Sequence, residues 1–302
     1  MITNLDPASD LFLANVDRIQ QSLAVANQQV SSGKKINVAS DSPDQIAPLL
    51  QLRANLQHNS QIQTNLASAQ ADASSADIAL SSAITMMDQA LTLGEQGANG
   101  TQTPDVLQDL AQQVQSIQQQ MVGVSQATSQ GRYIFSGDQM NSPAYTFNSA
   151  FLSTNPVLQQ SVAPATYQIE DPAGGSFAAA QSAQQIFASN SGGNVFTALN
   201  NLRLALLGGD ATTIANAIDP IKQASTQLNT MQAFYGQVET RILNATTYAG
   251  NLDTQLRARI SQTEDADVAS AAMQLTQSTT QLQAALQMQG KMPHSTLFDF
   301  LA

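Results

Sequence analysis

The sequence predicts a mainly α-helical protein: a long antiparallel helical rod, a coiled-coil bundle built from both chain ends, with a small β-containing domain inserted in the middle. Near both ends, apolar residues recur alternately three and four positions apart, as in a heptad repeat. No proline interrupts residues 221–292, and about 70 helical residues at about 1.5 Å each would be on the order of 105 Å long. In residues 133–196, by contrast, aromatic and β-branched residues form short runs between turn residues, as in strands.

The first predicted helix carries an a/d seam of apolar residues. After it, the non-periodic stretch SSGKKINVASDSPDQIA at 31–47 ends this helix and begins the next. Asp41 or Ser42 suits a helix N-cap, and Pro43 suits the first helical position. So short a helix is marginal alone, and we expect the chain ends to become ordered only when a partner subunit covers them. The seam consists of Phe12, Val16, Ile19, Leu23, Ala26 and Val30.

Two further helices are predicted before the middle of the chain. The second runs from about Pro43 to Leu93, with a seam rich in alanine that allows close approach between helices. The glycine-containing stretch GEQGANGTQT at 94–103 then breaks the pattern. Thr103 as N-cap and Pro104 at the first position start the third helix.

The middle of the chain changes character near Gly131. Short strands are expected in GRYIFSGDQ, in YTF at 145–147 and in TYQI at 166–169, and we expect this segment to have a core of its own. The predicted organisation is an N-terminal helix and linker (1–42), the N-terminal half of the rod (43–136), the small β-containing domain (137–190), the C-terminal half of the rod (191–262) and a C-terminal helix (263–302).

Helix returns after this domain, ends at Gly208 and Gly209, and restarts near Ala211. A long seam begins at Ile221 and, after a weak spot, resumes near the C-terminus. Because a single seam exposes an apolar stripe, the two terminal seams must be covered by each other, by the rest of the molecule or by a second copy. The C-terminal seam consists of Val268, Leu275, Leu282 and Leu286.

Composition argues against several classes of partner. Only 11% of the residues are charged, the formal net charge is −11, and the basic residues are scattered, so we expect no nucleic acid partner. Without cysteine there is neither a disulfide nor a thiolate nucleophile. No apolar run approaches the roughly 18 residues that span a bilayer, and the N-terminus lacks a basic region, so we expect neither a membrane partner nor a cleavable secretory signal.

No constellation of residues indicates catalysis. His58 and His294 lack a second ligand at metal-binding spacing, and we expect no enzyme activity, no cofactor and no metal. Glu264, Asp265 and Asp267 could form a cation site. We interpret them instead as solvated charge at a helix start, because Ser261 and Glu264 have the spacing of a capping box.

Several stretches together resemble the bacterial flagellin family. VSSGKKINVASDSPDQIA at 30–47 resembles its N-terminal signature, and RARISQTEDADVASAAMQLTQSTTQLQAALQ at 257–287 resembles its C-terminal signature, in matching order and position. GRYIFSG at 131–137 and the ending STLFDFLA resemble the hook–filament junction proteins of this family, the hook-associated protein 3 group, more than flagellin itself. Thr296, Phe298 and Phe300 depart from the pattern of that ending.

The resemblance implies a structural protein that is exported unfolded through the flagellar type III apparatus, with the help of an export chaperone. It implies self-assembly into a ring through the terminal coiled-coil segments, so that 1–42 holds the N-terminal assembly helix and linker and 263–302 the C-terminal assembly helix, while the domain at 137–190 faces outward. The ring would lie next to hook-associated protein 1 and flagellin in the extracellular flagellum. The implied inter-helix junction comprises Lys34, Lys35, Ile36, Asn37 and Asp41. Lys34, Lys35 and Asp41 would lie where neighbouring subunits meet, and capping within its own subunit is an equal alternative for Asp41. The implied C-terminal tail comprises Leu297, Phe298, Phe300 and Leu301.

Other functions fit less well. A flagellin that forms the filament itself shares both signatures and is the first alternative. A type III needle-tip or translocator protein is also rich in coiled coils, but the pairing of flagellin-like signatures at both ends argues against it. A cell-wall hydrolase would need acid/base or metal residues that the sequence does not show.

Overall fold

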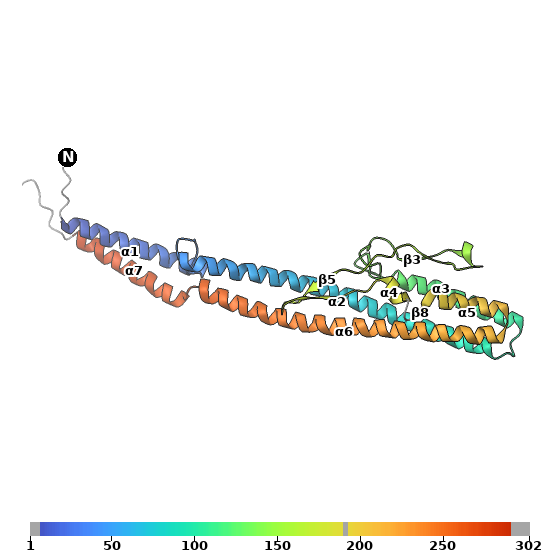
Figure 1. Cartoon of the computed structure of the whole chain (residues 1–302). Coiled ribbons are helices and arrows are strands. Elements are labelled where there is room, and N and C mark those ends of the chain that lie inside the picture. Colours follow the sequence, from blue (N-terminus) through green and yellow to red (C-terminus); the bar gives the residue numbers. More distant parts are fainter. Residues whose placement is uncertain (1–6, 190–192, 291–302) are drawn as a thin grey trace, which may run out of the picture. The chain divides into compact units, whose positions relative to one another are not determined.

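The structure is a computed structural model that describes residues 7–189 and 193–290. The described chain is mostly helical, with long helices contributed by both ends of the sequence and short antiparallel strands between them (Figure 1), which confirms the predicted fold class. The helices are α1 (Pro7–Ser32), α2 (Pro43–Ala98), α3 (Pro104–Ser125), α4 (Ala183–Phe187), α5 (Val195–Gly208), α6 (Ala211–Glu264) and α7 (Val268–Gln289). The strands are β1 (Thr128–Ser129), β2 (Arg132–Tyr133), β3 (Tyr145–Phe147), β4 (Val157–Gln159), β5 (Gln168–Glu170), β6 (Ser176–Ala178), β7 (Ala188–Ser189) and β8 (Gly193–Asn194), with a 3-10 turn at Ser149–Phe151.

The chain divides into two compact units. The terminal unit combines the chain up to His58 with the chain from Leu252 onward, and the central unit is Asn59–Asn251. The boundaries between the units fall inside the long helices α2 and α6, so that each of these helices has one part in either unit. In the part of the chain that the structure describes, no helix combines the length and the apolar character that a bilayer span requires.

Helix boundaries follow the predicted capping residues in several places. α2 begins at Pro43 and α3 at Pro104, where the Thr103 side chain accepts a hydrogen bond from the Val106 N–H. α5 ends with Gly209 in the left-handed conformation, which glycine adopts without steric cost. These boundaries confirm the predictions made from capping chemistry.

The prediction that α2 stops near Leu93 is wrong, because the helix continues through the glycines to Ala98. A Cβ atom at Gly94 would lie 3.1 Å from Leu202 of α5, and one at Gly97 would overlap Leu206 of the same helix. The two glycines therefore act here as sites of close helix packing rather than as breakers.

An unbroken helix over 221–292 is also wrong. α6 ends at Glu264 and α7 begins at Val268, so three residues separate the two helices. In this break the Ala266 N–H donates to the carbonyl oxygen of Gly33, a partner outside the helix, at 2.9 Å. Hydrogen bonding to the segment after α1 thus interrupts the helix at a place where the sequence showed only a weak spot in the apolar seam.

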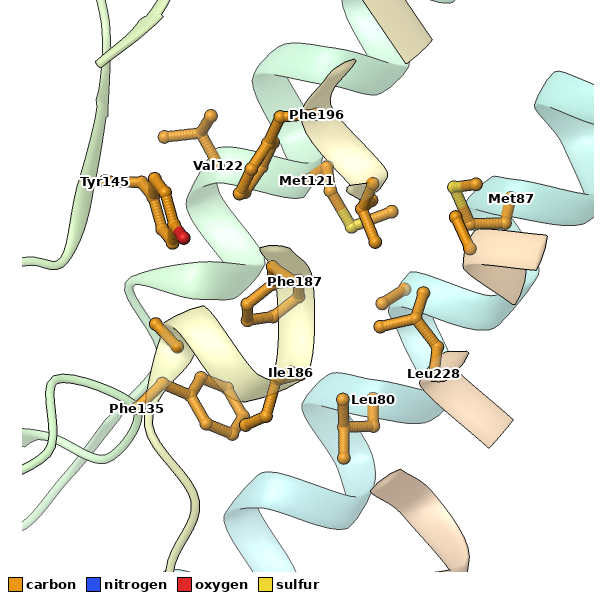
Figure 2. Packing of buried hydrophobic residues seen from close by; sticks show 14 of the residues in the cluster. Leu80, Met87, Met121, Val122, Phe135, Tyr145, Ile186, Phe187, Phe196 and Leu228 are labelled. Atoms are coloured by element: carbon orange, nitrogen blue, oxygen red, sulfur yellow. The ribbon is translucent and has the colours of Figure 1, made fainter. Parts of the chain in front are cut away.

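The core of the central unit gathers side chains from helices and from the middle segment. Figure 2 shows Phe135, Phe187 and Phe196 packed among residues of α2, α3 and α6. The rings of Phe135 and Phe187 meet edge to face, with centroids 5.6 Å apart. Each fully buried large side chain contributes about 1.5–3 kcal/mol. The expectation that the middle segment has its own core is wrong, since a single cluster includes both parts.

The strands of the middle segment form four separate two-stranded antiparallel sheets. The predicted strand YTF is β3, which pairs with β4 in the register Thr146 to Leu158. Gly137 has φ +59°, and a Cβ atom there would overlap the carbonyl oxygens of Ala163 and Pro164. Only glycine fits this close approach of two backbones, which holds the loop after β2 against residues 163–164.

One polar side chain lies in the interface of α2 with α6. Asn59 is buried, and its amide nitrogen donates to the carbonyl oxygen of Ala249 at 2.9 Å. A buried polar residue between paired helices favours the one register in which it finds its partner.

We predict that Gly97→Ala destabilises the central unit by about 1–3 kcal/mol, because the buried side chain of Leu206 would have to shift within a packed core. Gly123→Ala in α3 is the matched control, since a Cβ atom there has no neighbour within 4 Å. The control should be neutral or stabilising by up to about 1 kcal/mol. Denaturant unfolding measures both, and equal effects at the two positions would contradict the packing argument.

Candidate functional site

The segments that follow α1 and α6 lie side by side in the terminal unit. The Lys35 N–H donates to the carbonyl oxygen of Glu264 at 2.8 Å, and the Ala266 N–H donates to that of Gly33 at 2.9 Å. Lys34 and Asp265 thereby form an antiparallel bridge. The two stretches that sequence analysis singled out at opposite ends of the chain therefore meet, and we call this meeting point, residues 33–42 with 264–267, the junction.

Glu264 is the most buried charged side chain of the junction. It lies at the end of α6, its side chain is only 4% exposed, and it makes ion pairs with Lys34 and, at 2.6 Å, with Arg53 of α2. A carboxylate at a helix C-terminus is unfavourable by itself, and burial adds a desolvation cost. The two cations offset both costs.

The pKa of Glu264 reflects this balance. Burial raises the pKa of the carboxyl group, but hydrogen bonds to Lys34 and Arg53 and the charges of both residues outweigh burial, so that the pKa lies below its ordinary value. The carboxyl group is therefore ionised at neutral pH, and both ion pairs are in place.

The interpretation of Glu264 as solvated charge in a capping box is wrong. Glu264 ends α6 instead of starting a helix, and the Ser261 hydroxyl is hydrogen-bonded to Asp265. Asp267 is the N-cap of α7 and accepts hydrogen bonds from the Ala269 and Ser270 N–H groups. Within the described residues, no group of three His, Cys, Asp or Glu side chains is arranged to hold a metal ion.

Sequence reasoning missed Arg53. Its charge gave no signal at its own position, since α2 offers it no carboxylate three or four residues away. The only signal in the sequence was Glu264 itself, because an acidic residue at a helix C-terminus is unfavourable unless a cation from another segment pairs with it.

The remaining junction residues hold the loop between α1 and α2. Lys35 Nζ donates to the Gln262 carbonyl oxygen at 3.2 Å, and Ile36 is buried. Asn37 Nδ2 donates to the Lys34 carbonyl oxygen at 2.9 Å. Each residue thus contacts its own chain.

Asp41 stabilises the loop rather than capping α2. Its carboxylate accepts hydrogen bonds from the Val38 and Asn37 N–H groups at 2.9 and 2.8 Å, and these bonds lower its pKa. Asp41 itself is exposed to solvent.

The helices α1 and α7 pack against each other beside the junction, as Figure 1 shows at the blue and red ends of the chain. On α1 the predicted seam faces inward: Val16 and Ala26 are buried, and Phe12, Ile19, Leu23 and Val30 are half-buried. The opposing side of α7 includes the buried Ser278, whose hydroxyl lies 3.2 Å from that of Ser22. Small residues thus bring the two helices close together.

On α7 the predicted seam is only partly the packed face. Leu275 and Leu282 are half-buried, but Val268 and Leu286 are exposed. Val268 is the first residue of the helix, and Leu286 lies one position beyond the inward-facing Ala285. The packed residues of α7 are Ala271, Leu275, Ser278, Leu282 and Ala285. The predicted tail residues Leu297, Phe298, Phe300 and Leu301 lie outside the described residues, as does His294.

The outer surface of this helix pair carries large apolar side chains. Leu11 and Val25 of α1 are 65% and 50% exposed, and Met273 and Met288 of α7 are 68% and 65% exposed. Leu13, Val268 and Leu286 are exposed as well. Exposed apolar side chains mark a protein–protein interface where they form a continuous patch, whereas single ones are common on protein surfaces.

We predict that Glu264→Gln lowers the free energy of unfolding of the terminal unit by roughly 1.5–3 kcal/mol at pH 7, because it removes the charge that both cations bind. Folding lowers the pKa of Glu264, so its ion pairs stabilise fully above the ordinary value of 4.5 and are lost as pH falls through the lower folded value. The difference in urea midpoint between wild type and variant should therefore shrink in acid.

The control for this experiment is Asp253→Asn. Asp253 forms an ion pair with the solvent-exposed Arg257 one turn apart on α6, at 2.6 Å, and such pairs contribute little to stability. A Glu264→Gln effect as small as the control's, or one that persists at low pH, would refute the role of the buried carboxylate.

We also predict that Asp267→Ala destabilises the first turn of α7 by about 1 kcal/mol, because two N–H groups lose their acceptor. Asp267→Asn should retain most of the stability, since its amide oxygen can accept the same bonds. Hydrogen exchange at the Ala269 and Ser270 amides measures the effect, and equal protection in the alanine variant would contradict it.

Comparison with known proteins agrees with this arrangement. The model of the bacterial flagellin N-terminal helical region matches residues 6–140, and that of the bacterial flagellin C-terminal helical region matches residues 218–301. The junction thus joins the two regions that define one family. No curated protein matches the sequence.

Solved structures share the fold at low sequence identity. Flagellar hook-associated protein 3 of Legionella pneumophila matches with a TM-score of 0.60 and 10% identity, over 70% of this chain and 97% of its own. FlgL of Xanthomonas campestris matches with a TM-score of 0.59 and 15% identity, over 69% of this chain and 98% of its own. FlgL of Bacillus cereus matches with a TM-score of 0.56 and 19% identity, over 72% of this chain and 100% of its own. Because family models from the two ends of the flagellin sequence together match most of this chain, the protein belongs to the bacterial flagellin family.

Proposed function

We propose that this protein is a structural component of the bacterial flagellum, an adaptor that joins hook to filament by self-assembly through its terminal helices. Membership of the flagellin family supports an axial flagellar role. The similar folds of hook-associated protein 3 and of FlgL proteins support the hook–filament junction as its place. In this role the protein needs no catalytic centre.

The observation that carries the proposal is the apolar outer surface of the α1–α7 pair. Each helix uses one face for the other, with small residues at the contact, and still exposes large apolar side chains elsewhere. Burying such side chains contributes about 25 cal/mol per Å² of apolar surface. Contact with neighbouring subunits would supply that burial, so the terminal unit has the surface that an assembling subunit requires.

The proposed partners follow from this role. Copies of the chain form a ring, with hook-associated protein 1 on one side and flagellin on the other, and an export chaperone binds the chain before assembly. The protein would reach this position by flagellar type III export, which makes it an extracellular protein. Lys34, Lys35, Ile36, Asn37 and Asp41 would hold the subunit's terminal helices in place while the exposed helix faces meet neighbours.

We predict that Met273→Asp abolishes assembly while leaving the monomer folded, because Met273 points to solvent within the chain. Leu275→Asp and Leu282→Asp should also abolish assembly, but they act within the chain, by separating α7 from α1. Circular dichroism and size-exclusion chromatography before and after induced polymerisation distinguish the two mechanisms.

The matched control is Gln277→Asp, which adds the same charge at an exposed polar position of α7. It should assemble like wild type. Normal ring or polymer formation by Met273→Asp would show that this face of α7 is not the subunit interface.

Immunogold electron microscopy of whole cells tests the location directly. An antibody against residues 137–190, the segment proposed to face outward, should label one narrow band at the distal end of the hook. Label along the whole filament would instead identify a flagellin that forms the filament.

A further inference from the structure

The central unit contains a cavity of about 190 Å³ where the middle segment packs on α2 and α6. All of its lining residues belong to the central unit, whereas the junction belongs to the terminal unit. Its walls combine the polar residues Ser68, Asp72 and Arg132 with the aromatic residues Tyr133, Tyr167 and Tyr235. Drug-sized ligands need about 300–1,000 Å³, so this cavity fits a single small ring.

An ion pair makes the cavity electrically balanced. Arg132 Nη2 lies 3.3 Å from Asp72 Oδ2, and the two side chains are 41% and 33% exposed. A charged ligand would meet one attractive and one repulsive partner together. The pair therefore favours a neutral ligand that both donates and accepts hydrogen bonds.

The remaining polar groups are mostly hydroxyls. Within the part of the chain that the structure describes, the side-chain hydroxyls of Ser68, Tyr133 and Tyr167 make no hydrogen bond to the protein, which leaves each able to donate and accept. Tyr235 is different, because its buried hydroxyl accepts a hydrogen bond from the Gln181 N–H at 3.2 Å. Burial raises the pKa of Tyr235 to about 12, so this ring stays neutral as well.

We propose that this cavity binds one neutral polyhydroxylated ring, that is, a single monosaccharide unit. Its ring face would lie on Tyr167, which is 45% exposed, while its hydroxyls bond to Arg132, Asp72 and the free hydroxyls. Ala69, Ala76 and Ile134 line the cavity as well and suit the apolar C–H groups of such a ring. The bound unit is either a free sugar or the terminal unit of a glycan.

Titration calorimetry on the unassembled full chain tests the proposal. The probes are D-glucose, D-galactose and N-acetyl-D-glucosamine, each also as its methyl glycoside. At least one should bind saturably with a dissociation constant of about 1 mM. Tighter binding of the methyl glycoside indicates a glycan terminus, and tighter binding of the free form indicates a free sugar.

Variants locate the site. Tyr167→Ala should weaken binding about tenfold or more, because it removes a solvent-facing ring and leaves the core intact. Tyr248→Ala is the matched control, since Tyr248 is 48% exposed on α6 and does not line the cavity. Arg132→Met should remove binding of every sugar.

Charged rings provide the opposing test. Benzoate and benzamidine have a similar size but carry one charge, and both should bind more weakly than the best sugar. Stronger binding of either, no saturable binding of any sugar at about 50 mM, or an equal loss in Tyr248→Ala would overturn the proposal. Because the measurement needs no assembly, its failure leaves the proposed adaptor function untouched.

Discussion

The terminal unit depends on one buried carboxylate. Glu264 closes α6 in a position where both its burial and the helix dipole oppose its charge, and only cations from the N-terminal half compensate. One cation comes from the loop after α1 and the other from α2. A single side chain thus fixes the end of one long helix against the start of the other, and with it the place where α7 can begin.

Around this carboxylate the backbone completes the connection. The hydrogen bonds of Lys35 and Ala266 replace those that the interrupted helix gives up, so the break between α6 and α7 leaves these backbone groups paired. Asp41 does the same for the loop on the other side. Each of the two helix interruptions would leave backbone groups without hydrogen-bond partners, and the two segments supply these partners to each other.

The fold class was predictable because long heptad patterns report directly which residues face another helix. All six seam positions of α1 lie on its packed side: five of them are large and apolar, and Ala26 falls at the same heptad spacing. On α7 the pattern predicted partly the wrong residues. Its packed face includes Ala271, Ser278 and Ala285, whose small side chains allow close helix contact but give little signal in a hydrophobic pattern. Gly94 and Gly97 were misread for the same reason.

The candidate site was predictable only in part. The resemblance to the flagellin family marked the two stretches of the junction, but the roles of Glu264 and Arg53 follow from a contact across 211 positions. Local rules of helix capping assign an acidic residue to its nearest helix end, and here they chose the wrong one. Asp267 shows the same rules succeeding, because its partners are the next residues in the chain.

The distance along the chain between the partners at the junction governs when they can meet. The Lys35 side chain and the Gln262 carbonyl are separated by 227 positions, and Ser22 and Ser278 by 256. Contacts of such high sequence separation form slowly, because loop closure must precede any gain from them. A chain that emerges N-terminus first therefore keeps α1 without its intramolecular partner until α7 has emerged. During that interval the apolar seam of α1 is uncovered, and its exposure ends only when α7 packs against it.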